Sequence, residues 1–214
     1  MEGYMSDVST AGKLEIIPTI KEGIGIGLKN LVPILVNVIL WALTIWIPYL
    51  NVGTTIGLLI GIVSKASKGE SIGMTEIFDA KYRKYIGEFF LTSGLMGIGI
   101  AVGTAFFIIP GIVIALAWSL ALLLVIDKGK NPTEALVLSN NRTYGYKFKM
   151  FGILFLTCLA FGIVQGILLG ISGLIGIGAI MFIFGLLVFA IALVEIFALI
   201  GVQASIYKQL AGDA

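Results

Sequence analysis

The positively charged residues of this 214-residue chain are confined to four polar stretches. Of the fourteen, three lie near the N-terminus, five lie within residues 65–84, five lie within residues 128–149, and the last is Lys208. The stretches flank pairs of long apolar segments that contain no Lys or Arg. Basic side chains beside membrane-spanning helices stay on the cytoplasmic side. We therefore expect three membrane hairpins whose polar connections and termini all face the cytoplasm.

The composition excludes an ordinary soluble domain. Hydrophobic residues make up 58% of the chain and charged residues 12%, and the mean hydropathy is +1.07. Soluble domains carry about 25% charged residues. The net charge of +2 is spread over connections that also hold most of the acidic residues, so it does not indicate a nucleic-acid partner. We expect the basic residues to contact anionic lipids of the inner leaflet instead.

Reactive side chains are scarce. The chain has no His, and its one Cys, Cys158, lies in an apolar run. Disulfides within the chain and Cys/His metal sites are thereby excluded, as is the commonest general base. No group of residues combines a nucleophile with a base. We expect a protein without enzymatic activity, cofactor or metal.

The apolar segments predict an all-α integral membrane protein with six transmembrane helices in three hairpins. A polar lead (residues 1–17) precedes a single membrane domain (residues 18–208), and a short tail (residues 209–214) follows it. Pro110 and Gly111 mark the turn of the second hairpin. Segment 52–66 is short for a span, which leaves open whether it crosses fully or re-enters. The predicted spans are residues 31–47, 52–66, 87–108, 112–126, 149–169 and 178–206.

Three polar segments are predicted to form amphipathic cytoplasmic helices, each leading into one hairpin. They begin near Pro18, Thr75 and Asn131. In the third, Asn131 can cap the helix, Pro132 suits its first position, and Glu134 stands three residues after the cap. The alternative for these segments is a set of ordinary basic linkers near lipid phosphates.

Three polar residues in the predicted spans form a candidate intramembrane site. Apart from Glu88 at the start of the third span, Glu195 is the only acidic residue inside a span, and its thirteen-residue distance from Lys208 corresponds to roughly 20 Å of helix. Gln165 would lie at a similar depth on the neighbouring helix and could pair with it. Asn37 lies in the first span. An intramembrane carboxylate suggests ion or proton transport, whereas a hydrogen bond that ties two helices explains it without a substrate.

Rows of glycine at spacing four predict close helix packing, either within one bundle or between copies of the chain. Gly23, Gly25 and Gly27, in contrast, weaken the first amphipathic helix. The two longest rows are Gly53, Gly57 and Gly61 on the second span and Gly162, Gly166 and Gly170 on the fifth.

Several short motifs resemble the membrane domain of glycerophosphoryl diester phosphodiesterases and its stand-alone, mostly uncharacterised prokaryotic relatives. The family resemblance implies six helices and a prokaryotic plasma (inner) membrane, and it supplies no catalytic residues. The soluble phosphodiesterase domain of the fused members is absent, so that activity is not implied. The motifs are Ile109-Pro110-Gly111, Asp127-Lys128-Gly129, the stretch Asn131 to Leu136, Tyr144-Gly145-Tyr146 and the stretch Met74 to Phe90.

Two functions remain open at the level of sequence. The first is a non-enzymatic structural or assembly protein that acts through helix packing, with copies of itself or other membrane proteins as partners. The second is a small channel or transporter that uses Glu195 and Gln165.

Overall fold

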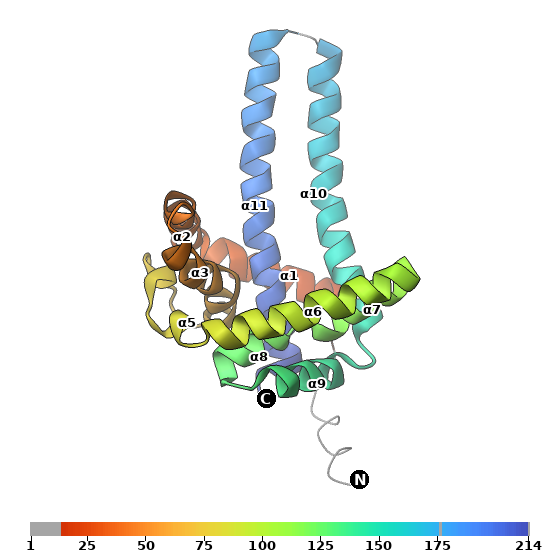
Figure 1. The fold of residues 1–214 in the computed structure, drawn as a ribbon. Helices are drawn as coiled ribbons and strands as arrows, with labels where there is room; N and C mark the ends of the chain where they lie inside the picture. The colour runs from red at the N-terminus through yellow and green to blue at the C-terminus, as the bar shows by residue number, and fades with distance from the viewer. Residues whose placement is uncertain (1–13, 176, 214) are drawn as a thin grey trace.

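The computed structural model describes residues 14–175 and 177–213, and in these ranges the chain forms helices and no strand (Figure 1). Most of the predicted lead, residues 1–13, lies outside the described part. In chain order the elements are α1 (Ile16–Lys29), α2 (Leu31–Thr44), α3 (Pro48–Ile56), the π-helical turn η3 (Gly57–Gly61), α4 (Ile62–Lys68), the 3-10 turn η4 (Glu76–Phe78), α5 (Lys81–Lys84), α6 (Ile86–Phe106), α7 (Ile108–Trp118), α8 (Ala121–Lys128), α9 (Pro132–Thr143), α10 (Lys147–Ile175) and α11 (Gly178–Ala211).

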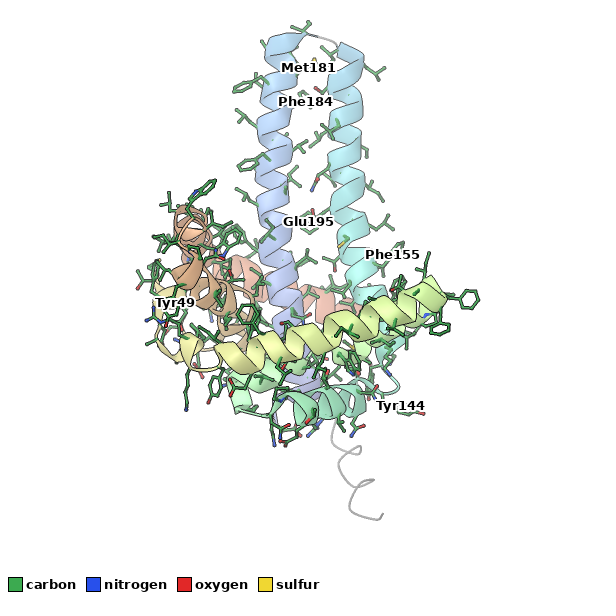
Figure 2. The ribbon with its side chains drawn as sticks, viewed as in Figure 1. Tyr49, Tyr144, Phe155, Met181, Phe184 and Glu195 are labelled. Atoms are coloured by element: carbon green, nitrogen blue, oxygen red, sulfur yellow. The ribbon has the colours of Figure 1, made fainter. Side chains whose placement is uncertain are left out.

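The longest elements, α10 and α11, form a tall hairpin that projects from the rest of the protein (Figure 1). They contain 29 and 34 residues. At 1.5 Å per residue the helices are roughly 44 and 51 Å long, more than the ~30 Å hydrocarbon core of a bilayer. Apolar side chains project outward along the hairpin (Figure 2), and many of them are exposed, such as Phe182 and Leu174. Lipid or another protein must cover this surface.

The second hairpin pairs α6 with α7 and α8, but its turn differs from the predicted one. The link between α6 and α7 is the single extended residue Phe107, whereas Pro110 and Gly111 lie inside the first turn of α7. Proline is accepted there because the first backbone N–H groups of a helix have no partner within it. Gly111 allows close packing instead of turning the chain, since a Cβ on it would lie 2.1 Å from Thr104 Oγ1.

In the first hairpin, the helix at the predicted span 31–47 is α2, which ends at Thr44. A bend of 70° separates α1 from α2. The 14 residues of α2 are roughly 21 Å long, too short to cross a bilayer alone. The following segment, expected to be the shorter one, is a run of 21 helical residues from Pro48 to Lys68. Two thirds of the most apolar window of this run is buried within the protein.

Within residues 14–175 and 177–213, five helical segments are therefore long and apolar enough to cross a membrane, and the bent α1–α2 pair could supply a sixth. These segments do not share one direction, because α6 lies across the base of the α10–α11 hairpin (Figure 1). The structure thus agrees with an all-helical chain of five to six candidate spans and differs from a simple bundle of parallel hairpins.

The predicted cytoplasmic helices have different outcomes. The α9 helix begins as expected: Glu134 N donates to Asn131 Oδ1 at 2.9 Å, and Pro132 is the first helical residue. The segment from Thr75 is not one helix but two short turns, η4 and α5, which lead into α6. Asp79 accounts for one break, because its side chain accepts from the backbone N–H of Lys81 at 2.9 Å and so starts a new turn.

The tightest helix crossing joins α1 to α11. A Cβ on Gly201 would lie 2.0 Å from Gly23 O and 2.6 Å from Gly27 N. Gly23 and Gly27, interpreted above as weakening α1, therefore allow its backbone to touch α11. Only Gly25, the glycine between them, faces open space.

Candidate functional site

Glu76, in the connection between the first two hairpins, is the centre of a buried ion-pair cluster. Its side chain is only 6% exposed. Lys65 Nζ lies 2.7 Å from Oε2, while Lys81 Nζ and the Tyr82 hydroxyl lie 3.0 and 2.7 Å from Oε1. Burial alone would raise the pKa of Glu76, but the hydrogen bonds from Lys65, Tyr82 and Lys81 outweigh it and lower the pKa to about 2. The carboxylate is therefore charged at physiological pH.

Asp127, at the end of α8, organises a second cluster next to the first. Its Oδ1 accepts from the Ser64 hydroxyl at 2.5 Å and from the Lys68 ammonium, both on α4. Its Oδ2 accepts from the Tyr207 hydroxyl of α11 at 2.9 Å. One carboxylate thus joins α4, α8 and α11.

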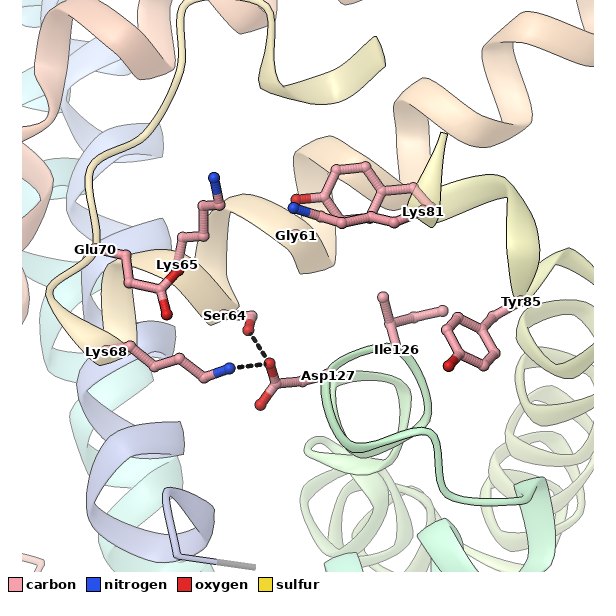
Figure 3. A pocket seen from close by; sticks show the side chains of 10 residues that line it. Gly61, Ser64, Lys65, Lys68, Glu70, Lys81, Tyr85, Ile126 and Asp127 are labelled. Carbon is pink, nitrogen blue, oxygen red and sulfur yellow. Dashed lines mark hydrogen bonds and ion pairs between the residues drawn. The ribbon is translucent and has the colours of Figure 1, made fainter. Parts of the chain in front are cut away.

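A cavity of about 230 Å³ lies between the two clusters (Figure 3). Its walls come from α4, from the connection that contains η4 and α5, and from the end of α8. The lining residues are Gly61, Ser64, Lys65, Lys68, Glu70, Lys81, Tyr82, Tyr85, Ile126 and Asp127.

The glycine row on the second span forms one wall of this region. A Cβ on Gly61 would lie 2.2 Å from the Tyr82 ring, and one on Gly57 would lie 2.8 Å from Ile77 Cα. A Cβ on Gly53 would meet the Arg83 side chain at 2.7 Å. The row was predicted to pack against another helix. Its partner is instead the polar connection between α4 and α6, which contains η4 and α5. This connection can approach closely because glycine has no side chain.

The second glycine row has no such partner within the described chain. Nothing lies within 4 Å of a Cβ placed on Gly162, Gly166 or Gly170. These residues form an open strip along α10.

The three polar residues of the predicted intramembrane site do not converge. Gln165 Nε2 donates to Glu195 Oε2 at 2.9 Å, so these two residues pair across the α10–α11 hairpin as their depths suggest (Glu195 is labelled in Figure 2). Asn37 is fully buried elsewhere. It donates to Gly73 O at 2.8 Å and accepts from Ile77 N at 3.1 Å, which ties α2 to the polar connection. Asn37 therefore anchors the connection around Gly73 and Ile77, and it does not form one polar site with Glu195.

A further polar contact joins α1 to α11 beside their glycine crossing. Glu22 lies 2.8 Å from Lys208 Nζ and 2.7 Å from the Ser205 hydroxyl. Thr19 and Gln209 are also hydrogen-bonded. This contact reinforces the crossing.

The clusters around Glu76 and Asp127 were not predicted from the sequence, because the charged residues of the connections were interpreted as markers of topology. One signal was available. Gly57, Gly61, Ser64 and Lys68 recur at helical spacing on one face and mark a groove with a polar end.

The described residues contain no group of three His, Cys, Asp or Glu side chains placed to hold an ion. No family model, curated protein or solved structure matches the chain, so the geometry alone must indicate its function.

Proposed function

We propose that the protein is a non-enzymatic structural or assembly component of a membrane, which acts by packing its α10–α11 hairpin against a second copy of the chain. The observation that carries this proposal is the open glycine strip on α10. Small residues four apart let two helix backbones approach closely, and within a bilayer such packing drives helix association. In the α1–α11 crossing the same spacing already serves this purpose within the chain.

The Gln165–Glu195 contact supports packing over transport. Each side chain has its partner on the opposite helix of the same hairpin, at 2.9 Å. Such a bond satisfies two polar groups that lipid would otherwise surround. It holds the hairpin together without a substrate.

The proposed setting is a prokaryotic plasma membrane with the basic connections and both termini in the cytoplasm. The distribution of Lys and Arg supports this orientation. Relatedness to the membrane domain of the glycerophosphoryl diester phosphodiesterases is part of the same proposal and rests on the short motifs alone.

The single cysteine provides a direct test. Cys158 is exposed on α10 and lies four residues before Gly162, so it extends the glycine strip. Two α10 helices that cross along the strip would bring the Cys158 residues of two copies close together. Disulfides form when the Cα atoms come within about 7 Å. Mild oxidation of native membranes should therefore produce a covalent dimer.

The matched control moves the thiol to the other side of α10. Ala160 is also exposed and lies roughly 200° around the helix from Cys158. The double variant Cys158→Ser/Ala160→Cys should give little dimer, and Gly162→Leu/Gly166→Leu should abolish the dimer of the native thiol. Equal cross-linking from both faces would indicate random collision, and no cross-linking from either face would refute an α10 interface.

A further inference from the structure

The second hairpin, formed by α6 with α7 and α8, has an apolar surface that lacks a partner within the described chain. Between Glu88 and Asp127 the sequence contains no charged residue. The four residues at the tip of the hairpin are each at least 70% exposed, namely Phe106, Phe107, Ile108 and Ile109. Soluble proteins rarely expose a contiguous apolar surface of this kind. Lipid or another protein must therefore cover it.

The direction of the second hairpin differs from that of α10 and α11. α6 lies across the base of the α10–α11 hairpin instead of beside it (Figure 1). An open groove is lined by Val113 of α7, Asn140 of α9 and Lys147, the first residue of α10. Val113 is six residues from Phe107 at the tip, or roughly 9 Å of helix. The tip therefore lies near the basic start of α10, whereas a hairpin that crossed the bilayer would place it about 30 Å away.

The polar helix α9 packs against the junction of α7 and α8, on the side away from the projecting ends of α10 and α11 (Figure 1). The Ser139 hydroxyl donates to Ala117 O at 2.7 Å and accepts from Leu120 N at 3.2 Å. Thr133 and Glu134 on the same helix are exposed. This arrangement is expected if water lies on the side of α9 and lipid on the side of the α10–α11 hairpin.

Lipid suits the exposed surface of α6 better than a protein does. Of the 21 residues of α6, only Thr92 and Gly103 are buried. A partner protein covers one face of a helix, whereas acyl chains can surround it. A helix with its side chains is about 10–12 Å across, and one leaflet provides about 15 Å of hydrocarbon. A helix that lies flat therefore fits within a single leaflet.

We propose that the second hairpin lies flat within the cytoplasmic leaflet and that its partner is the acyl chains of that leaflet. Two of the candidate spans, Ile86–Phe106 and Ile108–Lys128, then do not cross the membrane, although both are long and apolar enough to do so. The inference rests on the membrane setting proposed above, in which α10 and α11 cross the bilayer. It does not depend on dimerisation through α10.

The test measures the depth of nitroxide labels along α6 in membranes that contain the full-length protein. Single cysteines, in a Cys158→Ser background, replace three exposed residues that lie seven apart and so share one face of α6, namely Leu91, Ile98 and Ala105. Oxygen concentrates in hydrocarbon and a nickel chelate stays in water, so the ratio of their collisions with each label reports its depth.

A flat hairpin should give similar depths at the three positions, with frequent oxygen collisions and few nickel collisions. A crossing helix would place Ile98 roughly 10 Å deeper than Leu91 and Ala105, and that profile would overturn the proposal. Few collisions with either reagent would mean that protein covers α6, and frequent nickel collisions would mean that water does. Either result would also overturn the proposal.

The matched control uses α11, where three exposed residues have the same spacing, namely Phe182, Phe189 and Ile196. The depth should peak at Phe189, because α11 crosses the bilayer in the proposed setting. A peak on α11 together with equal depths on α6 would support the inference. Equal depths on both helices would overturn the crossing of α11 and the inference with it. Loss of the Cys158 cross-link, in contrast, would affect only the proposed dimer.

A second measurement uses a position between helices, where a substitution disturbs no helix interior. Phe107→Cys is compared with Ala179→Cys, near the start of α11, in right-side-out membrane vesicles treated with a membrane-impermeant maleimide. The reagent should label Ala179→Cys and leave Phe107→Cys unlabelled, because the tip of the second hairpin stays in the cytoplasmic leaflet. Equal labelling of the two variants would show that the second hairpin crosses the membrane and would refute the inference.

Discussion

The α1–α11 crossing predicts a large cost for a single added methyl group at Gly201. In the Gly201→Ala variant the new Cβ would lie 2.0 Å from Gly23 O and 2.6 Å from Gly27 N. Both are backbone atoms of α1, which cannot move aside as the end of a flexible side chain could. The helices would have to separate by about 1.4 Å to restore an ordinary 3.4 Å contact. Overpacking of this kind typically costs about 1–3 kcal/mol. Separation would also stretch the hydrogen bonds that Ser205 and Lys208 donate to Glu22, so we expect the upper end of this range.

Gly185→Ala on the same helix is the matched control. Nothing lies within 4 Å of a Cβ placed on Gly185. Both variants gain the same helix propensity of about 1 kcal/mol, so the difference between them isolates the packing cost. We expect Gly201→Ala to be less stable than Gly185→Ala by about 3 kcal/mol.

The assay is equilibrium unfolding in mixed micelles with increasing denaturing detergent, followed by far-ultraviolet circular dichroism. Gly25→Ala provides a second control on α1, since Gly25 faces open space between the two contact glycines. If Gly201→Ala and Gly185→Ala unfold at the same midpoint, the helices do not touch at Gly201 and the crossing described above is wrong.

Three further predictions concern polar contacts. Gln165→Leu should destabilise the α10–α11 hairpin by about 0.6–2 kcal/mol in the same unfolding assay. Glu195→Gln should cost less, because its amide oxygen can still accept from Gln165, and the opposite order would contradict the observed bond. Asn37→Leu should remove the bond to Gly73 O and leave the buried N–H of Ile77 without its partner, at a cost of about 1–3 kcal/mol for the buried N–H. Limited proteolysis should then cleave the connection around Gly73 faster, and unchanged cleavage would count against this anchor. The pKa of Glu76 is about 2 in the folded protein and 4.5 ordinarily, so the ionised carboxylate should stabilise the fold fully above pH 4.5 and lose this effect as the pH falls through 2. Wild type and Glu76→Gln should therefore converge in stability on acidification, and a constant difference would refute this.

The features that the sequence predicted well are local. The α9 cap depends on residues three apart, and the Gln165–Glu195 pair follows from the depth of each residue in adjacent helices of one hairpin. Spacing within one helix determines the first contact and depth along two neighbouring helices determines the second, and both are visible in the sequence.

The features that the sequence did not predict join distant segments. Asp127 bonds to Lys68 and Tyr207, which are 59 and 80 residues away along the chain. Helical spacing carries no information about which distant side chain will meet a given carboxylate. The same limit applies to glycine rows: the close approach at Gly61 was predictable, but its partner, a tyrosine ring instead of a helix, was not.

The pairing of α1 with α11 has a consequence for biosynthesis. Thr19 and Gln209 are 190 residues apart in sequence, yet they are hydrogen-bonded in the folded protein. At ribosomal rates of about 5–20 residues per second, α1 waits about 10–40 seconds before its partner helix exists. During that interval its glycine face and Glu22 have no α11 to contact. The contact between α1 and α11 therefore forms late in translation. A ribosome that stalls before α11 would release a protein whose first helix is exposed to quality-control proteases.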